Sequence, residues 1–366
     1  MIMSVADSKL GLVSPNMPVS IHNPEPADRK ETTTLADVAA RARVSVGTVS
    51  RILNGKYKEK WPSMVSRSAK IRRIAIKLGY RPNTAARSMS HGRFQAIGFV
   101  TCGDYEIDWY PINGLSGIYS VVEDMGWRLL INELPSAKIK DSALLPQLFR
   151  ESAVDGLIVN LLPMFSRTIA YFKKLRLPYV LFNVKQKQQC VYPDDFSGAA
   201  LAVSWLLSRD VRRIGYFCRS CAADIHYSMS DRLAGFQNAM KAANLESHRY
   251  LELSPSDDDR HMDVLQRAEF FLRRFPDVQG VICYESEEAV CLTATAKSLG
   301  IRVPNQLKVM GFNERVIRGN TGLPIETIEI PFYEVGQQCV KMLHSMIESQ
   351  DSELPSVAIP YRPFRF

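Results

Sequence analysis

Apolar side chains recur at helical spacing in the part of the chain that follows residue 33. Between residues 35 and 42 they occupy positions i, i+3, i+4 and i+7, and Val49, Ile52 and Leu53 form a second short stripe. A longer stretch, residues 63–78, carries the same kind of pattern. The sequence therefore predicts three helices in this N-terminal part.

The residues around the first two stripes favour two capped helices joined by a tight turn. Thr34 is a good N-cap for the first helix, and Asp37 places a negative charge in its first turn, where the helix dipole favours one. Ser45 can cap the second helix, which Asn54 and Gly55 end. Two short helices joined in this way form a helix-turn-helix.

The exposed side of the second helix carries small and hydroxyl side chains. Glycine and serine weaken a helix, so their presence here indicates that another molecule approaches this surface. In a helix-turn-helix the second helix enters the DNA major groove by its N-terminus. Its hydroxyl groups can then bond phosphates, and Arg51 can read a guanine edge through two hydrogen bonds. Gly47 lets the backbone approach the bases but offers them no side chain.

Residues 63–78 are expected to form a third helix with one apolar and one basic face. The predicted buried face consists of Val65, Ile71, Ile74, Ala75 and Leu78. The predicted outward face consists of Arg67, Lys70, Arg72, Arg73 and Lys77. Farther along, residues 83–89 can form a helix that is too short to be stable in water by itself. We expect DNA or a partner subunit to order it.

Positive charge is concentrated in this part of the chain. The whole sequence has a formal net charge of +8, and residues 27–93 alone hold 16 basic and 4 acidic residues. Residues 94–366, in contrast, hold 29 basic and 32 acidic residues. So strong a positive balance over so few residues indicates a site for a polyanion such as DNA.

From residue 94 onward the pattern changes to short apolar runs separated by amphipathic stretches. Runs such as AIGFV, DGLIVNL and PYVLFNV alternate with helix-like segments, and a second series begins at GAALAVSWLL. This alternation predicts parallel sheets covered by helices, and its repetition predicts two similar lobes. Ligands of such folds bind at the carboxyl ends of the strands, here between the lobes.

The basic part resembles the DNA-binding headpiece of the LacI family of bacterial repressors. The words TLADVAARARVSVGTVSRILNG, LGYRPNTAARSM and IGFV stand in the order and at the spacing typical of that family. The resemblance implies that residues 83–89 are a hinge helix that folds on the operator in pairs, with Met89 as a minor-groove wedge and Arg87 beside it. It also implies base-reading positions at Val46, Gly47 and Arg51, and backbone contacts from Thr34, Ser45, Thr48, Ser50, Asn54, Tyr80 and Asn83.

The remainder of the chain looks like the periplasmic-binding-protein-like effector domain of the same family. This resemblance rests on DGLIVN, DDFSGAALAVSWL, RRIGYF, DRLAGF, LKVMGFN and TIEIPFYEVG. The pocket that it implies combines an arginine, several amides and aromatic rings, which suit a sugar through hydrogen bonds and stacking. The implied pocket residues are Asp104, Tyr105, Asn160, Asn183, Arg232, Tyr284, Ser286, Asn313 and Phe332.

Departures from the family pattern concern what is bound. The stretch KYKEKWPSMV after Gly55 is longer than in most members, and its lysines are candidate phosphate contacts. Asn313 replaces an aspartate that many members have, and Asn183 replaces an aspartate found in a member of the family. Tyr284 and Glu285 replace the usual Asn and Asp, and the tyrosine adds bulk. These changes leave the operator sequence and the effector open.

Motifs that would mark an enzyme are missing from the sequence. It contains no GxGxxG that opens a helix, no GxxxxGK[ST], no GxSxG and no HExxH, and its six histidines are scattered. We therefore expect neither catalysis nor a cofactor or bound metal. Seven cysteines without a secretory signal, and no apolar run of membrane-spanning length, indicate a reducing, cytoplasmic location. Cys218 and Cys221 form a single CxxC, which is a weak metal or redox signal.

These features together predict a domain order and a function. We expect a flexible tail over residues 1–30, an all-α helix-turn-helix headpiece over 31–82, a hinge helix and linker over 83–93, and a bilobed α/β domain of two parallel-sheet subdomains over 94–366. The predicted function is a homodimeric transcription regulator that binds double-stranded operator DNA under the control of a small-molecule effector, a sugar or related metabolite. The resemblance makes a repressor the default, and activation or corepression stays open. The alternative is a bilobed small-molecule binding protein without a regulatory DNA role. Salt-dependent DNA binding separates the two.

Overall fold

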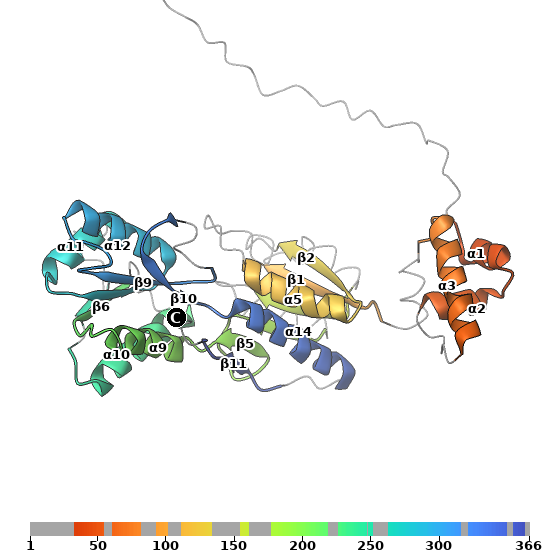
Figure 1. Ribbon diagram of the computed structural model, residues 1–366. Helices are drawn as coiled ribbons and strands as arrows, with labels where there is room; N and C mark the ends of the chain where they lie inside the picture. The colour runs from red at the N-terminus through yellow and green to blue at the C-terminus, as the bar shows by residue number, and fades with distance from the viewer. Residues whose placement is uncertain are drawn as a thin grey trace, which may run out of the picture. The chain divides into compact units, whose positions relative to one another are not determined.

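The computed structural model divides the chain into two compact units. It describes residues 33–54, 61–81, 93–101, 111–133, 154–160, 177–218, 226–246, 248–251, 263–315, 321–349 and 354–362. One unit ends at Thr84 and the other begins at Ala85. The predicted tail and most of the predicted hinge lie outside the described residues. Both units are drawn in Figure 1.

The first unit is helical, as the apolar stripes predict. It contains α1 (Leu35–Ala42), α2 (Val46–Leu53) and α3 (Pro62–Lys77). Their inward faces form one small core, which consists of Val38, Ala39, Val49, Ile52, Ile71 and Ala75.

The prediction that Val65 belongs to the buried face of α3 is wrong. Val65 is 47% exposed. The inward side of α3 instead follows Ser68, Ile71 and Ala75, which are buried at spacings of three and four residues. Continued toward the N-terminus, that spacing leads to the half-buried Met64 and leaves Val65 on the flank of the helix.

Local hydrogen bonds fix where α1 and α2 begin. Thr34 and Asp37 form a capping box: the Asp37 N–H donates to Thr34 Oγ1 at 3.3 Å, and the Thr34 N–H donates to the Asp37 carboxylate at 2.7 Å. The bond from the Thr34 backbone holds the pKa of Asp37 below its ordinary value. Arg43, with a left-handed φ of 55°, ends α1, and Ser45 then caps α2 by accepting from the Thr48 N–H at 3.3 Å. Both predicted N-caps are confirmed.

The second unit contains two sheets, and their paired strands run parallel. The first sheet has the order β11-β5-β4-β3-β1-β2 and the second the order β10-β9-β8-β6-β7. The first is built from β1 (Ala96–Thr101), β2 (Arg128–Glu133), β3 (Gly156–Asn160), β4 (Tyr179–Phe182), β5 (Cys190–Pro193) and β11 (Val357–Ile359). The second is built from β6 (Ile214–Cys218), β7 (His248–Leu251), β8 (Gly280–Cys283), β9 (Lys308–Asn313) and β10 (Ile325–Glu329). The prediction of two parallel-sheet lobes is confirmed.

The end of the chain returns to the first lobe. After β10, helix α14 (Phe332–Ser349) packs on α5 (Ile112–Asp124), and β11 then pairs with β5. The two helices lie side by side in Figure 1. They approach to backbone contact, because a Cβ on Gly117 would lie 2.0 Å from the Tyr333 carbonyl oxygen. The glycine is therefore required by packing.

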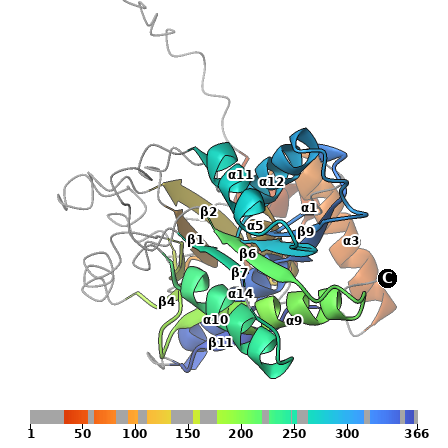
Figure 2. The same ribbon diagram turned by 90° about the vertical axis from the view of Figure 1, so that its left-hand side faces the viewer.

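Helices cover both faces of the second sheet. Figure 2 shows α9 (Asp195–Leu207) and α10 (Tyr227–Ala242) on one face, with α11 (Val264–Arg274) and α12 (Ser286–Ser298) on the other. The largest apolar cluster includes side chains from both sheets, so the two lobes share a continuous core. Within the described residues, no helix is both long and apolar enough to cross a membrane.

Candidate functional site

The N-terminal turn of α2 presents an open surface. Val46 is 45% exposed, and Ser45, Gly47 and Arg51 are exposed as well. The predicted contact residues Thr48, Ser50 and Asn54 are half-buried on the flanks of the helix. Helix packing thus directs Val49 and Ile52 inward and leaves the predicted base-reading residues accessible.

Within the described part of the chain, the polar side chains of α2 bond to near neighbours. Ser45 Oγ lies 2.9 Å from Thr48 Oγ1, and the Asn54 amide donates to Ser50 Oγ at 3.2 Å. The Arg51 Nε–H donates to the carbonyl oxygen of Gly47 at 3.3 Å. Each of these bonds is made at the helix surface, where water or another molecule can replace it at small cost.

The packing of the first unit does not explain Gly47. A Cβ built there would have no heavy atom within 4 Å, and the residue lies in the middle of the first turn of a helix. Alanine at this position would favour the helix by up to about 1 kcal/mol. Packing among the described residues therefore gives no reason for the glycine, and its close approach to DNA stays a prediction.

Other predicted DNA contacts are placed differently. The hydroxyl of Thr34 donates to the Asp37 carboxylate at 2.7 Å, and Tyr80 packs against the core of the first unit. Asn83, Arg87 and Met89 lie outside the described residues. The predicted basic face of α3 is confirmed as exposed: Arg67, Lys70, Arg72, Arg73 and Lys77.

In the second unit, four predicted pocket residues stand at the carboxyl ends of strands. Asn160 ends β3 and Asn313 ends β9, while Asn183 follows β4 and Tyr284 follows β8. Ser286 is the first residue of α12. Contacts between the lobes occur at these ends, so the expectation that the site lies between the lobes agrees with the geometry. Asp104 and Tyr105 lie outside the described residues.

A buried ion pair that the sequence did not predict lies at this site. Arg232 of α10 donates from Nε to Asp195 Oδ1 at 2.6 Å, and their side chains are 6% and 1% exposed. The hydroxyl of Tyr361 donates to the same oxygen at 2.7 Å. Burial alone would lower the pKa of Arg232, but the Asp195 carboxylate, together with Tyr361 and Tyr284, outweighs burial and holds that pKa well above the ordinary value. Arg232 is therefore charged and paired with Asp195 Oδ1, whereas Asp195 Oδ2 is buried with no hydrogen-bond partner among the described residues.

Arg232, a predicted pocket residue, already forms several contacts within the second unit. Its Nη1 group donates to the Tyr284 carbonyl oxygen at 2.7 Å, in addition to the Nε bond to Asp195. Its guanidinium also lies over the rings of Tyr284 and Phe312, with its Cζ 4.8 Å and 4.0 Å from their centroids. Because Nε and Nη1 both bond groups of the chain, Arg232 links α9, α10 and the end of β8.

A chain of hydrogen bonds crosses from the second lobe to the first. Tyr284 Oη lies 2.8 Å from Ser228 Oγ, which lies 2.7 Å from His226 Nδ1. His226 Nε2 lies 2.9 Å from the Asn183 carbonyl oxygen. The Ser228 N–H donates to Nδ1 at 3.3 Å, so Nδ1 is the acceptor and Nε2 carries the proton that bonds Asn183. This arrangement requires a neutral imidazole.

Burial sets the charge state of the titratable side chains in this hydrogen-bond network. It lowers the pKa of His226 and raises the pKa of Tyr284 to about 12. Both residues are therefore neutral near pH 7. The site thus contains one paired arginine and aspartate, amides, hydroxyls and a neutral imidazole.

Further contacts join the lobes on two sides of the site. The Tyr227 hydroxyl donates to Asn183 Oδ1 at 3.1 Å, and Lys185 forms an ion pair with Asp231 at 2.5 Å. On the other side, the backbone N–H of Asn113 donates to the Glu314 carboxylate at 3.1 Å. The structure thus holds the lobes together through side chains at the ends of β4 and β9.

Three predicted pocket residues are more deeply buried than residues that line an open pocket. Asn160 and Asn183 are each 5% exposed, and Phe332 is 2% exposed with its ring 5.7 Å from that of Phe182. Glu285 precedes α12 and takes part in its capping box. The roles of these residues toward an effector stay predictions.

The predicted cysteine pair gives no metal site in the described residues. Cys218 is buried at the end of β6, and Cys221 lies outside them. In the same part of the chain, no cluster of three or more His, Cys, Asp or Glu side chains could hold a metal ion.

Two sequence families match the chain. Residues 34–83 match "Bacterial regulatory proteins, lacI family", and residues 203–364 match "Periplasmic binding protein-like domain". The first match contains α1–α3, and the second contains most of the second lobe together with α14 and β11. Together they span more than half of the chain.

Individual proteins of known name align along nearly the whole length. The HTH-type transcriptional regulator RegA of Clostridium saccharobutylicum is 25% identical over 90% of this chain and 97% of its own. The regulator GalR of Escherichia coli is 25% identical over 90% of this chain and 93% of its own. Among solved structures, the Lac repressor dimer bound to operator and an anti-inducer shares the fold with a TM-score of 0.67, at 20% identity, over 90% of this chain and 97% of that one. The chain belongs to the LacI family of bacterial regulatory proteins.

Proposed function

We propose that this chain is a transcription regulator that binds operator DNA as a homodimer and is controlled by a small molecule held between its lobes. The exposed N-terminal turn of α2 carries the proposal, because Gly47 there has no packing reason. We propose that the regulator represses transcription. Relatives named as repressors support this, such as the ribose operon repressor of Halalkalibacterium halodurans, which is 26% identical over 90% of this chain.

On DNA, α2 lies in the major groove. Arg51 releases the Gly47 carbonyl and bonds a guanine edge, while Val46 and Gly47 lie against neighbouring bases. Met89 wedges into the minor groove at the centre of the operator, with Arg87 beside it. The proposed backbone contacts are made by Thr34, Ser45, Thr48, Ser50, Asn54, Tyr80 and Asn83.

The effector is a neutral, hydroxyl-rich molecule such as a sugar. The site between the lobes has its one buried cation paired, and its remaining polar groups are amides and hydroxyls. Such groups suit hydroxyls better than phosphates or carboxylates. The proposed contacts are Asp104, Tyr105, Asn160, Asn183, Arg232, Tyr284, Ser286, Asn313 and Phe332.

We infer a cytoplasmic location and no catalytic role. Both inferences are supported by membership in a family of regulators and by relatives named as regulators along nearly the whole chain. The second candidate is a bilobed binding protein without a DNA role. It does not explain why the chain has a capped helix-turn-helix with a basic third helix.

Selection of duplexes from a random pool tests the proposed function. The full chain is expected to enrich a pseudo-palindrome, because two headpieces of a homodimer read two half-sites. Enrichment of no sequence by the full chain would favour the second candidate. A Val46→Glu variant is the control, since a carboxylate at the groove should abolish enrichment without unfolding an exposed position.

A thermal-shift screen tests the effector. The panel consists of neutral monosaccharides and oligosaccharides, sugar phosphates and nucleobases. A ligand at 100 times its Kd stabilises the folded protein by about 2.7 kcal/mol. We expect a neutral sugar to raise Tm, and Tyr284→Phe to reduce that shift. A sugar phosphate as the strongest ligand would contradict the proposed chemistry of the site.

A further inference from the structure

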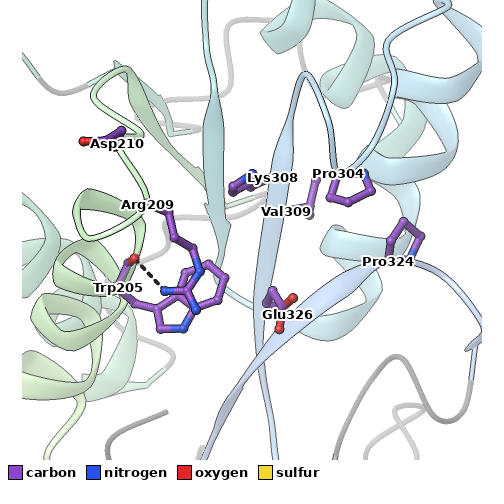
Figure 3. Close-up of a pocket in the computed structure, with 8 residues that line it drawn as sticks. All are labelled: Trp205, Arg209, Asp210, Pro304, Lys308, Val309, Pro324 and Glu326. Carbon is purple, nitrogen blue, oxygen red and sulfur yellow. Dashed lines mark hydrogen bonds between the residues drawn. The ribbon is translucent and has the colours of Figure 1, made fainter. Parts of the chain in front are cut away.

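A cavity lies in the second lobe, away from the site between the lobes. It has a volume of about 410 Å³ and is lined by Trp205, Arg209, Asp210, Pro304, Lys308, Val309, Pro324 and Glu326. Figure 3 shows these side chains between the last turn of α9 and the first residues of β9 and β10. A cavity of this size holds a small organic ligand.

The fold places this cavity at the opposite end of the lobe from the interlobe site. Asp195 begins α9 and pairs with Arg232, whereas Trp205 lies about 15 Å farther along the same helix. Lys308 begins β9, and Asn313 ends it at the interlobe site. A ligand in the cavity would therefore bind independently of an effector between the lobes.

Two walls of the cavity are flat. On one side is the indole of Trp205, covered by the Arg209 guanidinium, whose Cζ lies 3.6 Å from the ring centroid. Figure 3 shows the rings of Pro304 and Pro324 on the opposite side. The Arg209 Nη1 group is anchored by donating to the Trp205 carbonyl oxygen at 3.3 Å. Walls of this kind suit a flat ring, which can stack on the guanidinium plane.

Two charged groups of opposite sign face the cavity. Val309 pairs with Ile325, so Lys308 and Glu326 lie on the same side of the sheet, two residues apart in register. In the described part of the chain neither forms an ion pair. Asp210 contributes little, because its side chain is 97% exposed and Figure 3 shows its carboxylate turned away from Lys308.

We infer that this cavity binds a small aromatic or heterocyclic anion that also carries a hydrogen-bond donor. Its anionic group would bond the Lys308 ammonium, its ring would lie between the Arg209–Trp205 stack and the prolines, and its donor would meet the Glu326 carboxylate. The inference goes beyond the proposed function and does not depend on it.

Calorimetric titration of the full chain with 4-hydroxybenzoate tests this site. We expect a Kd of about 1 mM or tighter for this fragment-sized probe. The neutral analogue 4-hydroxybenzamide is expected to bind at least about tenfold more weakly, because it lacks the charge-assisted bond to Lys308. Binding of both probes with equal affinity, or of neither, would overturn the proposal.

Variants of lysines assign the binding to this cavity. Lys308→Gln is expected to weaken 4-hydroxybenzoate binding about tenfold, and Lys308→Arg to retain most of it. Lys297→Gln is the matched control, since Lys297 is an exposed lysine of α12 that does not line the cavity. Unchanged binding in Lys308→Gln would overturn the proposal, as would an equal loss in Lys297→Gln. Thermal melting of each variant verifies that it is folded.

Discussion

The polar side chains of α2 and those of the interlobe site are used in opposite ways. On α2, Ser45, Ser50 and Arg51 bond within four residues of themselves and stay at the surface. Between the lobes, Arg232 and Asp195 are buried and bond partners far away in the chain. The first arrangement leaves groups for another molecule at little cost to the fold. The second makes the polar groups part of the fold itself.

This difference predicts how substitutions behave. Changes on α2 should alter DNA binding and leave the free energy of unfolding nearly unchanged. Changes in the interlobe network should alter both the free energy of unfolding and the response to effector. The variants below test that separation, from the largest expected effect to the smallest.

Arg232→Met should give the largest loss of stability. It leaves the Asp195 carboxylate buried without its cation, which typically costs about 3–5 kcal/mol. Urea unfolding of the full chain measures the change. The matched control is Arg273→Met, which removes an exposed ion pair with Glu269 and should cost less than about 0.5 kcal/mol. Equal costs for the two variants would show that the Arg232–Asp195 pair does not stabilise the fold.

Arg51→Ala should have its effect on DNA alone. We expect a loss of about 1–3 kcal/mol in binding to the selected duplex and relaxed specificity at one base position. The free energy of unfolding should change by less than about 0.5 kcal/mol, since Arg51 is exposed. Binding to a set of single-base operator variants measures both terms. Uniform weakening over all positions would assign Arg51 to the phosphate backbone.

Gly47→Ala should raise the free energy of unfolding and lower the affinity for DNA. Because nothing lies near the added methyl group, the variant should gain up to about 1 kcal/mol of stability. Its affinity for the operator should fall, since the backbone can no longer approach the bases as closely. A variant that is more stable and binds DNA equally well would remove the proposed reason for the glycine.

The pH dependence of stability should reveal His226. Its pKa is lowered in the folded chain by burial, so the unfolded chain takes up the proton first as the pH falls. The contribution is fully present above the unfolded pKa of about 6.5 and is lost as the pH falls below it, toward the lowered folded value. Asp195, Asp231, Arg232 and Tyr227 also face this imidazole. Urea unfolding between pH 7.5 and pH 5 should show a shallower decline for His226→Gln than for the native chain.

Local features of the fold could be predicted from the sequence, and distant pairings could not. Thr34, Asp37 and Ser45 act on backbone groups three residues away, so their capping roles follow from spacing alone. Val65 was misplaced because the spacing of a short helix allows neighbouring faces, and only the packed core decides between them.

The interlobe site shows the same limit more strongly. Parallel strands and their carboxyl ends place Asn183, Tyr284 and Asn313 correctly at the level of topology. Asp195 and Tyr361 could not be assigned to Arg232, because they come 37 residues before it and 129 after it in the chain. These three side chains come together because α9, α10 and the segment after β11 pack on one another, and no local sequence pattern predicts that packing.

The salt dependence of DNA binding tests the central claim most directly. Affinity of the full chain for the duplex that it selects would be measured by fluorescence anisotropy between about 50 and 200 mM salt, the range over which phosphate contacts weaken strongly. We predict that log affinity falls linearly with log salt concentration, and that Arg51→Ala lowers affinity for this duplex more than for a scrambled one. Absence of binding, or equal affinity for both duplexes at every salt concentration, would contradict the account.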